Sequence, residues 1–392
     1  MEFGWSEEEQ SFRAEVRAFL KEHWDPKPLH DFGTDDHKAR EYVRAFKMTL
    51  AEHGWLTMAW PTEYGGQGAS FVRQMIFKEE SAIQKAPTSG GAEVILAPAL
   101  MIHGTDEQRR EYLTPIARGE VLWSQGYSEP GAGSDLASLQ TRAVRDGDEY
   151  VVNGQKVWTS HAHYADWIML LSRTNPEAPK HRGITFLLVD LRSPGVTINP
   201  LINMAWGHEF NEEFFEDVRV PADQMVGEEN RGWYVAMTLL DNERSNITGA
   251  MSVQRKIDRL LAYLGSEEGA RRSRLSRHDA LRQQIAQRAV EAAVLFNLSL
   301  RIITMQRQGM VPNYEASVAK MFGSEAGQRM DRTGIKVFGL YANLWDAEDP
   351  LSPMEAAFTH DYVRSIPATI GAGSSEIQRN VIATRGLGLP RG

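Results

Sequence analysis

The residues best suited to acid–base chemistry lie at the end of a helical pattern that begins at Trp233, where Glu243 and Arg244 are adjacent. Glu243 shares one stripe of this helix, at spacings of three and four residues, with Ala236, Leu240 and Ile247. A carboxylate on an apolar stripe is costly unless a partner stabilises it, and Arg244 is the adjacent candidate. The two residues are therefore either an ion pair at a helix–helix seam or a functional carboxylate with its partner.

A second candidate is the stretch from Gln125 to Asp135, which reads Gln-Gly-Tyr-Ser-Glu-Pro-Gly-Ala-Gly-Ser-Asp. A predicted strand runs here into glycines and serines, which leaves backbone N–H groups and hydroxyls available to a ligand that approaches closely. The alternative for this stretch is a surface turn between strands. A further run, Lys156-Val-Trp-Thr-Ser160, places Trp158 on a strand, where a tryptophan ordinarily belongs to the core or to an interface.

His161, His163 and Asp166 have a spacing typical of metal ligands, but no further ligand clusters with them in the sequence. We therefore expect ordinary strand or loop histidines and no metal site. The 15 methionines are scattered and indicate packing residues.

These residues must be positioned by helices and strands, and the hydrophobic periodicity that predicts them changes along the chain. Helical spacing runs from Ser6 to about residue 119, with capping boxes predicted at Ser6 with Glu9 and at Thr105 with Gln108. Short β-rich runs follow, at 168–171, 184–189 and 214–218, with turn pairs at Asp146-Gly147 and Asn153-Gly154. Helical segments return at 279–306, 315–338 and 376–385.

We therefore predict an α+β multidomain chain: a helical domain over 1–120, a β-barrel or β-sandwich domain over 121–229, and a helical domain over 230–392. A chain of 392 residues with 42% hydrophobic residues can bury a core large enough for several domains. The net charge of −9 argues against nucleic acid or an anionic membrane surface as a partner. The absence of cysteine excludes disulfides, thiolate metal sites and iron–sulfur clusters.

The first residues are acidic, unlike a signal peptide, and we expect no apolar run of membrane length. These features predict a cytoplasmic protein without membrane insertion.

The order of an α, a β and an α domain, together with several motifs, resembles the acyl-CoA dehydrogenase family across essentially the whole chain, and implies that the last domain is a four-helix bundle. Besides the two stretches above, the motifs are Trp60-Pro-Thr-Glu-Tyr-Gly-Gly-Gln-Gly68, His103-Gly-Thr-Asp-Glu-Gln108 and Gly371-Ala-Gly-Ser-Ser-Glu-Ile-Gln-Arg-Asn380. The resemblance implies FAD as cofactor. It also implies the residues that contact FAD, which are Gln125, Tyr127, Ser128, Gly133, Ser134, Trp158, Thr159, Ser160, Ser374 and Glu376. In this family the tryptophan covers the dimethylbenzene end of the flavin, and Thr159 or Ser160 would hydrogen-bond to the ring.

One position departs from the commonest family pattern. Ala372 stands where the closing motif usually carries the glutamate that acts as catalytic base. Family members that act on branched or long acyl chains instead place their base immediately before an arginine on the helix that opens the last domain, and Glu243-Arg244 matches that pattern. The resemblance thus implies Glu243 as the base, the backbone N–H of Ala372 as a donor to the thioester oxygen, and substrate contacts from Ser134, Asp241 and Arg244.

The implied partners are an acyl-CoA substrate, an electron-transfer flavoprotein and further subunits. Two segments that reach a neighbouring subunit's FAD in homotetrameric members are not intact here, at 268–272 and 336–342. Either a homotetramer or an α2β2 assembly with a related chain is therefore expected. The alternatives on the same fold are a flavin oxidase or hydroxylase, a non-catalytic partner subunit, and a DNA-binding relative, against which the net charge of −9 speaks.

Overall fold

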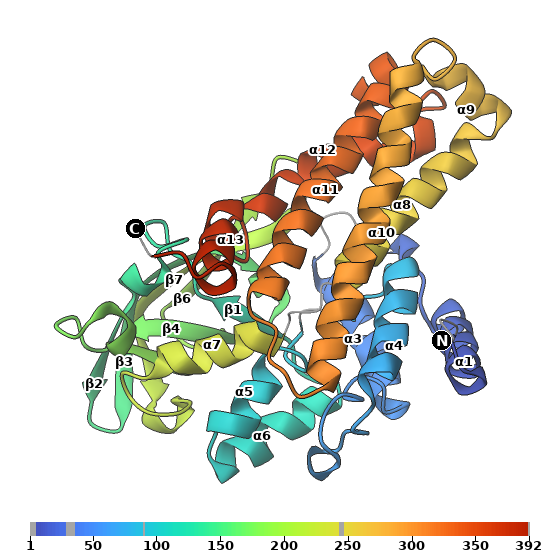
Figure 1. The fold of residues 1–392 in the computed structure, drawn as a ribbon. Helices are drawn as coiled ribbons and strands as arrows, with labels where there is room; N and C mark the ends of the chain where they lie inside the picture. Colours follow the sequence, from blue (N-terminus) through green and yellow to red (C-terminus); the bar gives the residue numbers. More distant parts are fainter. Residues whose placement is uncertain (1–4, 29–35, 89–90, 243–246, 391–392) are drawn as a thin grey trace. The chain divides into compact units, whose positions relative to one another are not determined.

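The computed structural model describes residues 5–28, 36–88, 91–242 and 247–390 (Figure 1). The chain forms two compact units. The first unit comprises Met1–Gln74 and Gln84–Glu243, and the second comprises Met75–Ile83 and Arg244–Gly392.

Helices form the N-terminal part of the first unit. They are α1 (Glu7–His23), α3 (Asp36–Glu52), the start of α4 (Phe71–Ile83), α5 (Leu96–His103) and α6 (Asp106–Ala117). Both predicted capping boxes are confirmed, with Ser6 and Thr105 each accepting from the backbone N–H three residues on. The Gln108 side chain also donates to the carbonyls of Asp223 and Met225, at 2.6 and 2.8 Å. This helical layer is thus tied to the sheet that follows.

A curled seven-stranded sheet forms the rest of the first unit. Its strands are β1 (Trp123–Gly126), β2 (Arg142–Asp146), β3 (Glu149–Ser160), β4 (Trp167–Arg173), β5 (Ile184–Asp190), β6 (Val196–Ile202) and β7 (His208–Pro221). The order is β1-β4-β2-β3-β7-β6, and β5 pairs with the other side of β4. β1 and β4 are parallel and β2 meets β4 in parallel, whereas the remaining pairs are antiparallel. The predicted β domain is confirmed.

The turn predicted at Asn153-Gly154 is wrong. These residues lie inside β3, where the pairing with β7 shifts register between Val152 and Gly154. A Cβ at Gly154 would lie 2.7 Å from the Thr141 Cα, and the backbone there has φ 152°. The glycine therefore serves a β-bulge and a close backbone approach. The other pair, Asp146-Gly147, does form the tight turn between β2 and β3, with Gly147 at φ 64°.

Helix α7 (Gly232–Asn242) belongs to the first unit and leads directly to residue 243. Val235 and Ala236 are buried in the same apolar cluster as Leu100 of α5 and Phe186 of β5. A Cβ at Gly232 would lie 2.3 Å from the Phe186 N, so only glycine allows the start of α7 to approach β5 this closely.

The second unit is helical, as predicted for the C-terminal domain. It contains α8 (Ile247–Leu264), α9 (Glu267–Arg272), α10 (Asp279–Arg307), α11 (Tyr314–Phe338), α12 (Ala357–Arg364) and α13 (Ser375–Val381), which continues as a π-helical turn over Ile382–Gly386. The three long helices α8, α10 and α11 pack against one another (Figure 1). Their shared core includes Leu260, Leu295, Met330 and Phe338.

Within the described residues, α10 is long and apolar enough to cross a membrane, judged by length and composition alone. The expectation that no apolar run reaches that length is therefore wrong. Ile285, Ala292 and Leu295 of α10 are buried in the core of the second unit. The core helix of a bundle meets the same criterion, because its inner face must be apolar along its whole length.

Candidate functional site

Two segments singled out in the sequence are joined by a buried ion pair. The fully buried Lys156 Nζ of β3 lies 2.8 Å from Glu129 Oε1 and 3.0 Å from the Tyr127 carbonyl. The other hydrogen bonds of the Glu129 carboxylate come from the backbone N–H groups of Gln140 and Thr141, at 2.6 and 2.8 Å. The loop after β1 is therefore held rigidly against the end of β3.

The charges of this pair are strongly perturbed. Burial alone would raise the pKa of Glu129, but the nearby Lys156 ammonium and the hydrogen bonds outweigh it and hold that pKa below its usual value. Burial lowers the pKa of Lys156 to about 8, against the opposing effect of Glu129. The sequence analysis did not predict that Glu129 and Lys156 form an ion pair. The available signal was that each of the two motifs contains one of these charged residues.

Trp158 projects from a bulge at the end of β3. The register against β7 shifts between Val157 and Thr159, and Trp158 has φ 64°. Its side chain is 61% exposed and meets the ring of Phe210 edge-on, with centroids 6.0 Å apart. A non-glycine residue in this conformation persists only where its surroundings enforce it. The bulge thus presents a large aromatic face for a planar ligand.

The loop after β1 forms a tight turn closed by reciprocal backbone hydrogen bonds between Glu129 and Ala132, at 3.0 and 3.1 Å. A Cβ built on Gly131 or Gly133 would meet nothing within 4 Å, and Gly133 and Ser134 are exposed. This open backbone fits the close approach of a cofactor's polar groups. Earlier in the segment, Gln125 and Ser128 are half-buried and Tyr127 is buried.

Thr159 and Ser160 differ in what their hydroxyls can reach. Thr159 is buried, and its Oγ1 donates to Glu213 Oε2 of β7 at 2.5 Å. Ser160 is exposed at the strand end. Of the two, Ser160 therefore has the hydroxyl that is accessible to a bound ring. Glu213 is a fully buried carboxyl that sequence reasoning missed, and burial raises its pKa to about 8.

The residues with metal-like spacing have protein partners. Asp166 forms an ion pair with Arg40 and accepts from the Leu122 N–H at 2.9 Å. His163 Nδ1 faces Asn211 Oδ1 at 3.1 Å. In the part of the chain that the structure describes, no three His, Cys, Asp or Glu side chains are grouped to hold a metal ion.

In the second unit, the loop before α13 holds Ala372 in a left-handed conformation, with φ 52°. Lys320 Nζ donates to the Gly373 carbonyl at 2.7 Å, and Gln378 Nε2 donates to the Ala372 carbonyl at 3.1 Å. These hydrogen bonds use carbonyl groups, and no acceptor among the described residues is found for the Ala372 N–H. The backbone is thus held while that donor stays available.

Ser374 is the N-cap of the helix after this loop, and it accepts from the Ile377 N–H at 3.4 Å. Gln378 reaches back to the loop carbonyls and does not cap an N–H group. Glu376 is exposed in the first turn, and hydrogen bonds from its own backbone N–H and from Ser374 lower its pKa.

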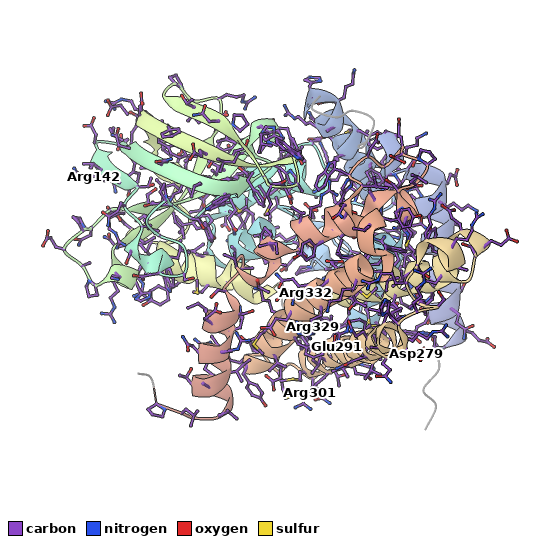
Figure 2. All side chains as sticks on the ribbon, turned by 90° about the horizontal axis from the view of Figure 1, so that it is seen from above. Arg142, Asp279, Glu291, Arg301, Arg329 and Arg332 are labelled. Carbon is purple, nitrogen blue, oxygen red and sulfur yellow. The ribbon has the colours of Figure 1, made fainter. Side chains whose placement is uncertain are left out.

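A chain of charges ties α13 to the long helices. Arg379 of α13 pairs with Glu325 of α11 at 2.6 Å, and Glu325 also lies 3.7 Å from Arg329. Arg329 in turn pairs with Glu291 of α10 at 3.2 Å, and Figure 2 shows these two side chains together. The position of the Ala372 loop is thereby linked to the core of its own unit.

The remaining predicted site residues lie at or beyond the end of α7. Glu243 and Arg244 fall outside the described residues, and for Asp241 the structure gives the helical backbone alone. The segment 268–272 lies within α9, where Arg272 pairs with Glu268 at 2.5 Å. The segment 336–342 closes α11 and enters a 3-10 turn.

Known protein families match almost the whole length of this chain. Residues 6–120, 124–218 and 230–387 match the N-terminal, middle and C-terminal domains of acyl-CoA dehydrogenases. The acyl-CoA dehydrogenase FadE26 of Mycobacterium tuberculosis is 35% identical over 400 residues, which cover 100% of this chain and 99% of the relative.

Two solved structures are similar over the full length of both chains. One is the ChsE4-ChsE5 complex from Mycobacterium tuberculosis, with a TM-score of 0.87, 35% identity and 100% coverage of each chain. The other is the Tcur3481-Tcur3483 steroid ACAD, with a TM-score of 0.87, 32% identity and 100% coverage of each chain. The chain therefore belongs to the acyl-CoA dehydrogenase family, whose members are FAD-dependent oxidoreductases.

Proposed function

We propose that this protein catalyses the α,β-dehydrogenation of an acyl-CoA thioester to the trans-2-enoyl-CoA. Membership of the family supports the reaction class. The observation that carries the proposal is the pairing of the two flavin motifs through Glu129 and Lys156, beside the exposed Trp158 bulge. A chain that had lost its cofactor would have little reason to retain an exposed tryptophan in a strained conformation.

The residues proposed to hold FAD are those of the loop after β1 and of the β3 bulge. Gly133 and Ser134 offer open backbone and a hydroxyl, Trp158 offers an aromatic face, and Ser160 offers an exposed hydroxyl. Ser374 and Glu376 are further proposed FAD contacts, on the family resemblance of their motif. When bound, the flavin supplies the acceptor for the hydride that leaves the substrate β carbon.

Glu243 is proposed to remove the α proton of the substrate. The support is its place directly after α7, together with a methyl side chain at residue 372. Exclusion of water by an apolar acyl chain would raise the pKa of a carboxylate there, which suits a general base near neutral pH. Asp241, Arg244 and Ser134 are proposed to contact the substrate.

Loss of the α proton places negative charge on the thioester oxygen, which needs a hydrogen-bond donor. The Ala372 N–H is the proposed donor. Its support is the backbone held by Lys320 and Gln378 through carbonyl groups. Replacement of a glutamate by alanine at this position removes a base and keeps the N–H, so relocation of the base is chemically consistent.

The proposal extends to partners. Electrons are proposed to pass to an electron-transfer flavoprotein, and the assembly is proposed to be an α2β2 heterotetramer with a related chain. The similarity to the ChsE4-ChsE5 complex and to the Tcur3481-Tcur3483 steroid ACAD, each of which is named for two proteins, supports the second point. A cytoplasmic location is part of the same proposal, and the cysteine-free composition is compatible with it.

The test of the base assignment is Glu243→Gln, with Glu228→Gln in the turn before α7 as the matched control. We expect Glu243→Gln to lower kcat by at least about 10²-fold, the lower end of the range for general-base catalysis, while FAD stays bound. The control should keep wild-type turnover. Activity retained by Glu243→Gln would mean that another residue is the base.

A further inference from the structure

Glu213 lies in a buried polar cluster beneath the Trp158 bulge. The cluster joins β3 to β7, where Lys156 is the register partner of Glu213 and Thr159 is the register partner of Asn211. Lys156, Thr159, Asn211 and Glu213 are all at most 1% exposed. Such a concentration of polar groups inside a sheet requires an explanation, because buried polar groups are costly unless they are fully paired.

Residues of β7 hold both the side chain and the backbone carbonyl of Thr159. Its Oγ1 donates to Glu213 Oε2 at 2.5 Å, and its carbonyl accepts from Asn211 Nδ2 at 3.0 Å. Asn211 is itself fixed, because its Oδ1 lies 2.9 Å from His208 Nε2 and 3.1 Å from His163 Nδ1. The two imidazole rings stack with their centroids 3.9 Å apart.

The Glu213 carboxyl is not optimised for stability. Its Oε1 is buried and has no hydrogen-bond partner in the described part of the chain. Its cross-strand neighbour Lys156 directs its ammonium to Glu129 instead. An apolar side chain at residue 213 would avoid this unsatisfied oxygen, so a role in stability alone does not account for the carboxyl.

We propose that Glu213 is a positioning residue that, together with Asn211, clamps Thr159 and thereby fixes the Trp158 bulge in the shape that faces the cofactor. The role of Glu213 toward the cofactor rests on the proposed function, because it requires the flavin to lie at the β3 bulge. Glu213 is not among the residues predicted to contact FAD, and it acts through its hydrogen bond with Thr159.

The experiment compares four full-length proteins: the wild type, Glu213→Val, Glu213→Gln and the control Glu216→Gln, which changes an exposed glutamate on the same strand. The first measurement is amide hydrogen exchange at residues 158–160 in the FAD-free protein. The second is the Kd for FAD, from the change in flavin fluorescence on titration. Thermal unfolding establishes that each variant is folded.

Loss of one hydrogen bond predicts about tenfold faster exchange at residues 158–160 and about tenfold weaker FAD binding in Glu213→Val. Glu213→Gln keeps a hydrogen-bonding group of the same shape and should restore both values. Glu216→Gln should match the wild type. Wild-type exchange at residues 158–160 in folded Glu213→Val overturns the proposal.

A further variant covers the case in which Glu213→Val does not fold. Thr159→Val removes the other half of the same hydrogen bond, and wild-type exchange in that variant overturns the proposal equally. Faster exchange combined with unchanged FAD affinity would support the role of Glu213 in positioning the bulge. The same result would contradict the proposal that FAD binds at the bulge. The two proposals can therefore fail separately.

Discussion

At Ala372 the backbone adopts a left-handed conformation, with φ 52°, which costs a residue that has a Cβ about 1–2 kcal/mol. Hydrogen bonds from Lys320 and Gln378 to the carbonyls of Gly373 and Ala372 hold the backbone in this conformation. Strain of this kind concentrates at functional positions, which is compatible with a donor N–H that must point in one direction. The role proposed for residue 372 uses its backbone N–H and not its side chain.

Ala372→Gly is therefore expected to raise the free energy of unfolding by about 1 kcal/mol, because glycine adopts positive φ without penalty. Turnover should persist, since the N–H remains. Urea unfolding and steady-state kinetics measure the two quantities. Ala347→Gly, at an alanine that is not among the positive-φ residues, is the control and should lose stability. Equal loss of stability in both variants would contradict strain at residue 372.

The buried Glu213 predicts a pH dependence of stability. Its pKa in the folded protein is raised to about 8, from an ordinary value of 4.5, because burial disfavours the charged form. The protonated group therefore stabilises the folded state fully below 4.5, and this contribution is lost as the pH rises through about 8. The charged groups that act on it are Lys156, which lowers its pKa, and Glu212, which raises it.

Relative to the wild type, Glu213→Gln should thus become more stable as the pH is raised from 5 to 9, because the amide has no proton to lose. The free energy of unfolding in urea at pH 5, 7 and 9 measures this difference. Glu216→Gln should remain parallel to the wild type across the same range. Parallel profiles for all three proteins would show that the Glu213 carboxyl has an ordinary pKa.

Part of the candidate site could be predicted from residue types alone. Glycines and hydroxyls after a strand, and a tryptophan on a later strand, identified the two segments that Lys156 joins. The partner of Thr159 could not be predicted, because the bulge between Val157 and Thr159 changes which side chains face inward. The partner of Lys156 could not be predicted either, because Glu129 lies on a loop and not on a neighbouring strand. Sequence periodicity cannot locate a bulge of this kind, since one extra residue reverses the two faces of a strand.

At the scale of elements, the caps and long helices were predictable because their signals are local. Ser6 with Glu9, and Thr105 with Gln108, satisfy helix N-termini whatever the rest of the fold does. The Asn153-Gly154 turn failed because an Asn-Gly pair signals a hairpin only if the chain reverses there, and β7 instead continues to pair with β3 past this point. Long-range pairing thus overrode a local preference. The domain limits at residues 120 and 229 stay a prediction.

Helix α11 contains two glycines in contrasting surroundings, which gives a matched prediction about packing. A Cβ at Gly334 would lie 2.1 Å from Phe358 Cδ1, whereas a Cβ at Gly327 would meet nothing within 4 Å. Gly334→Ala should destabilise the protein by about 1–3 kcal/mol through overpacking. Gly327→Ala should stabilise it by up to about 1 kcal/mol through helix propensity.

Thermal unfolding of the two alanine variants measures both effects. A similar shift of Tm in the same direction for both would contradict the close contact of α11 with α12 that this structure describes.

At the scale of the whole molecule, the incomplete segments at 268–272 and 336–342 bear on assembly. Under the α2β2 proposal, the chain purified alone should hold less than one FAD per chain, and co-expression with a neighbouring related chain should restore full occupancy. Light scattering coupled to size-exclusion chromatography, with absorbance of released FAD, measures both quantities. A stable homotetramer with full FAD from this chain alone would refute the heterotetramer.

The central claim is tested most directly by the anaerobic visible spectrum of the FAD-bound protein during titration with acyl-CoA thioesters. The panel contains straight, branched, long-chain and steroid side-chain thioesters. We predict that at least one thioester bleaches the oxidised flavin band of the wild type and leaves that of Glu243→Gln unchanged. Bound FAD that no thioester reduces would contradict assignment as an acyl-CoA dehydrogenase.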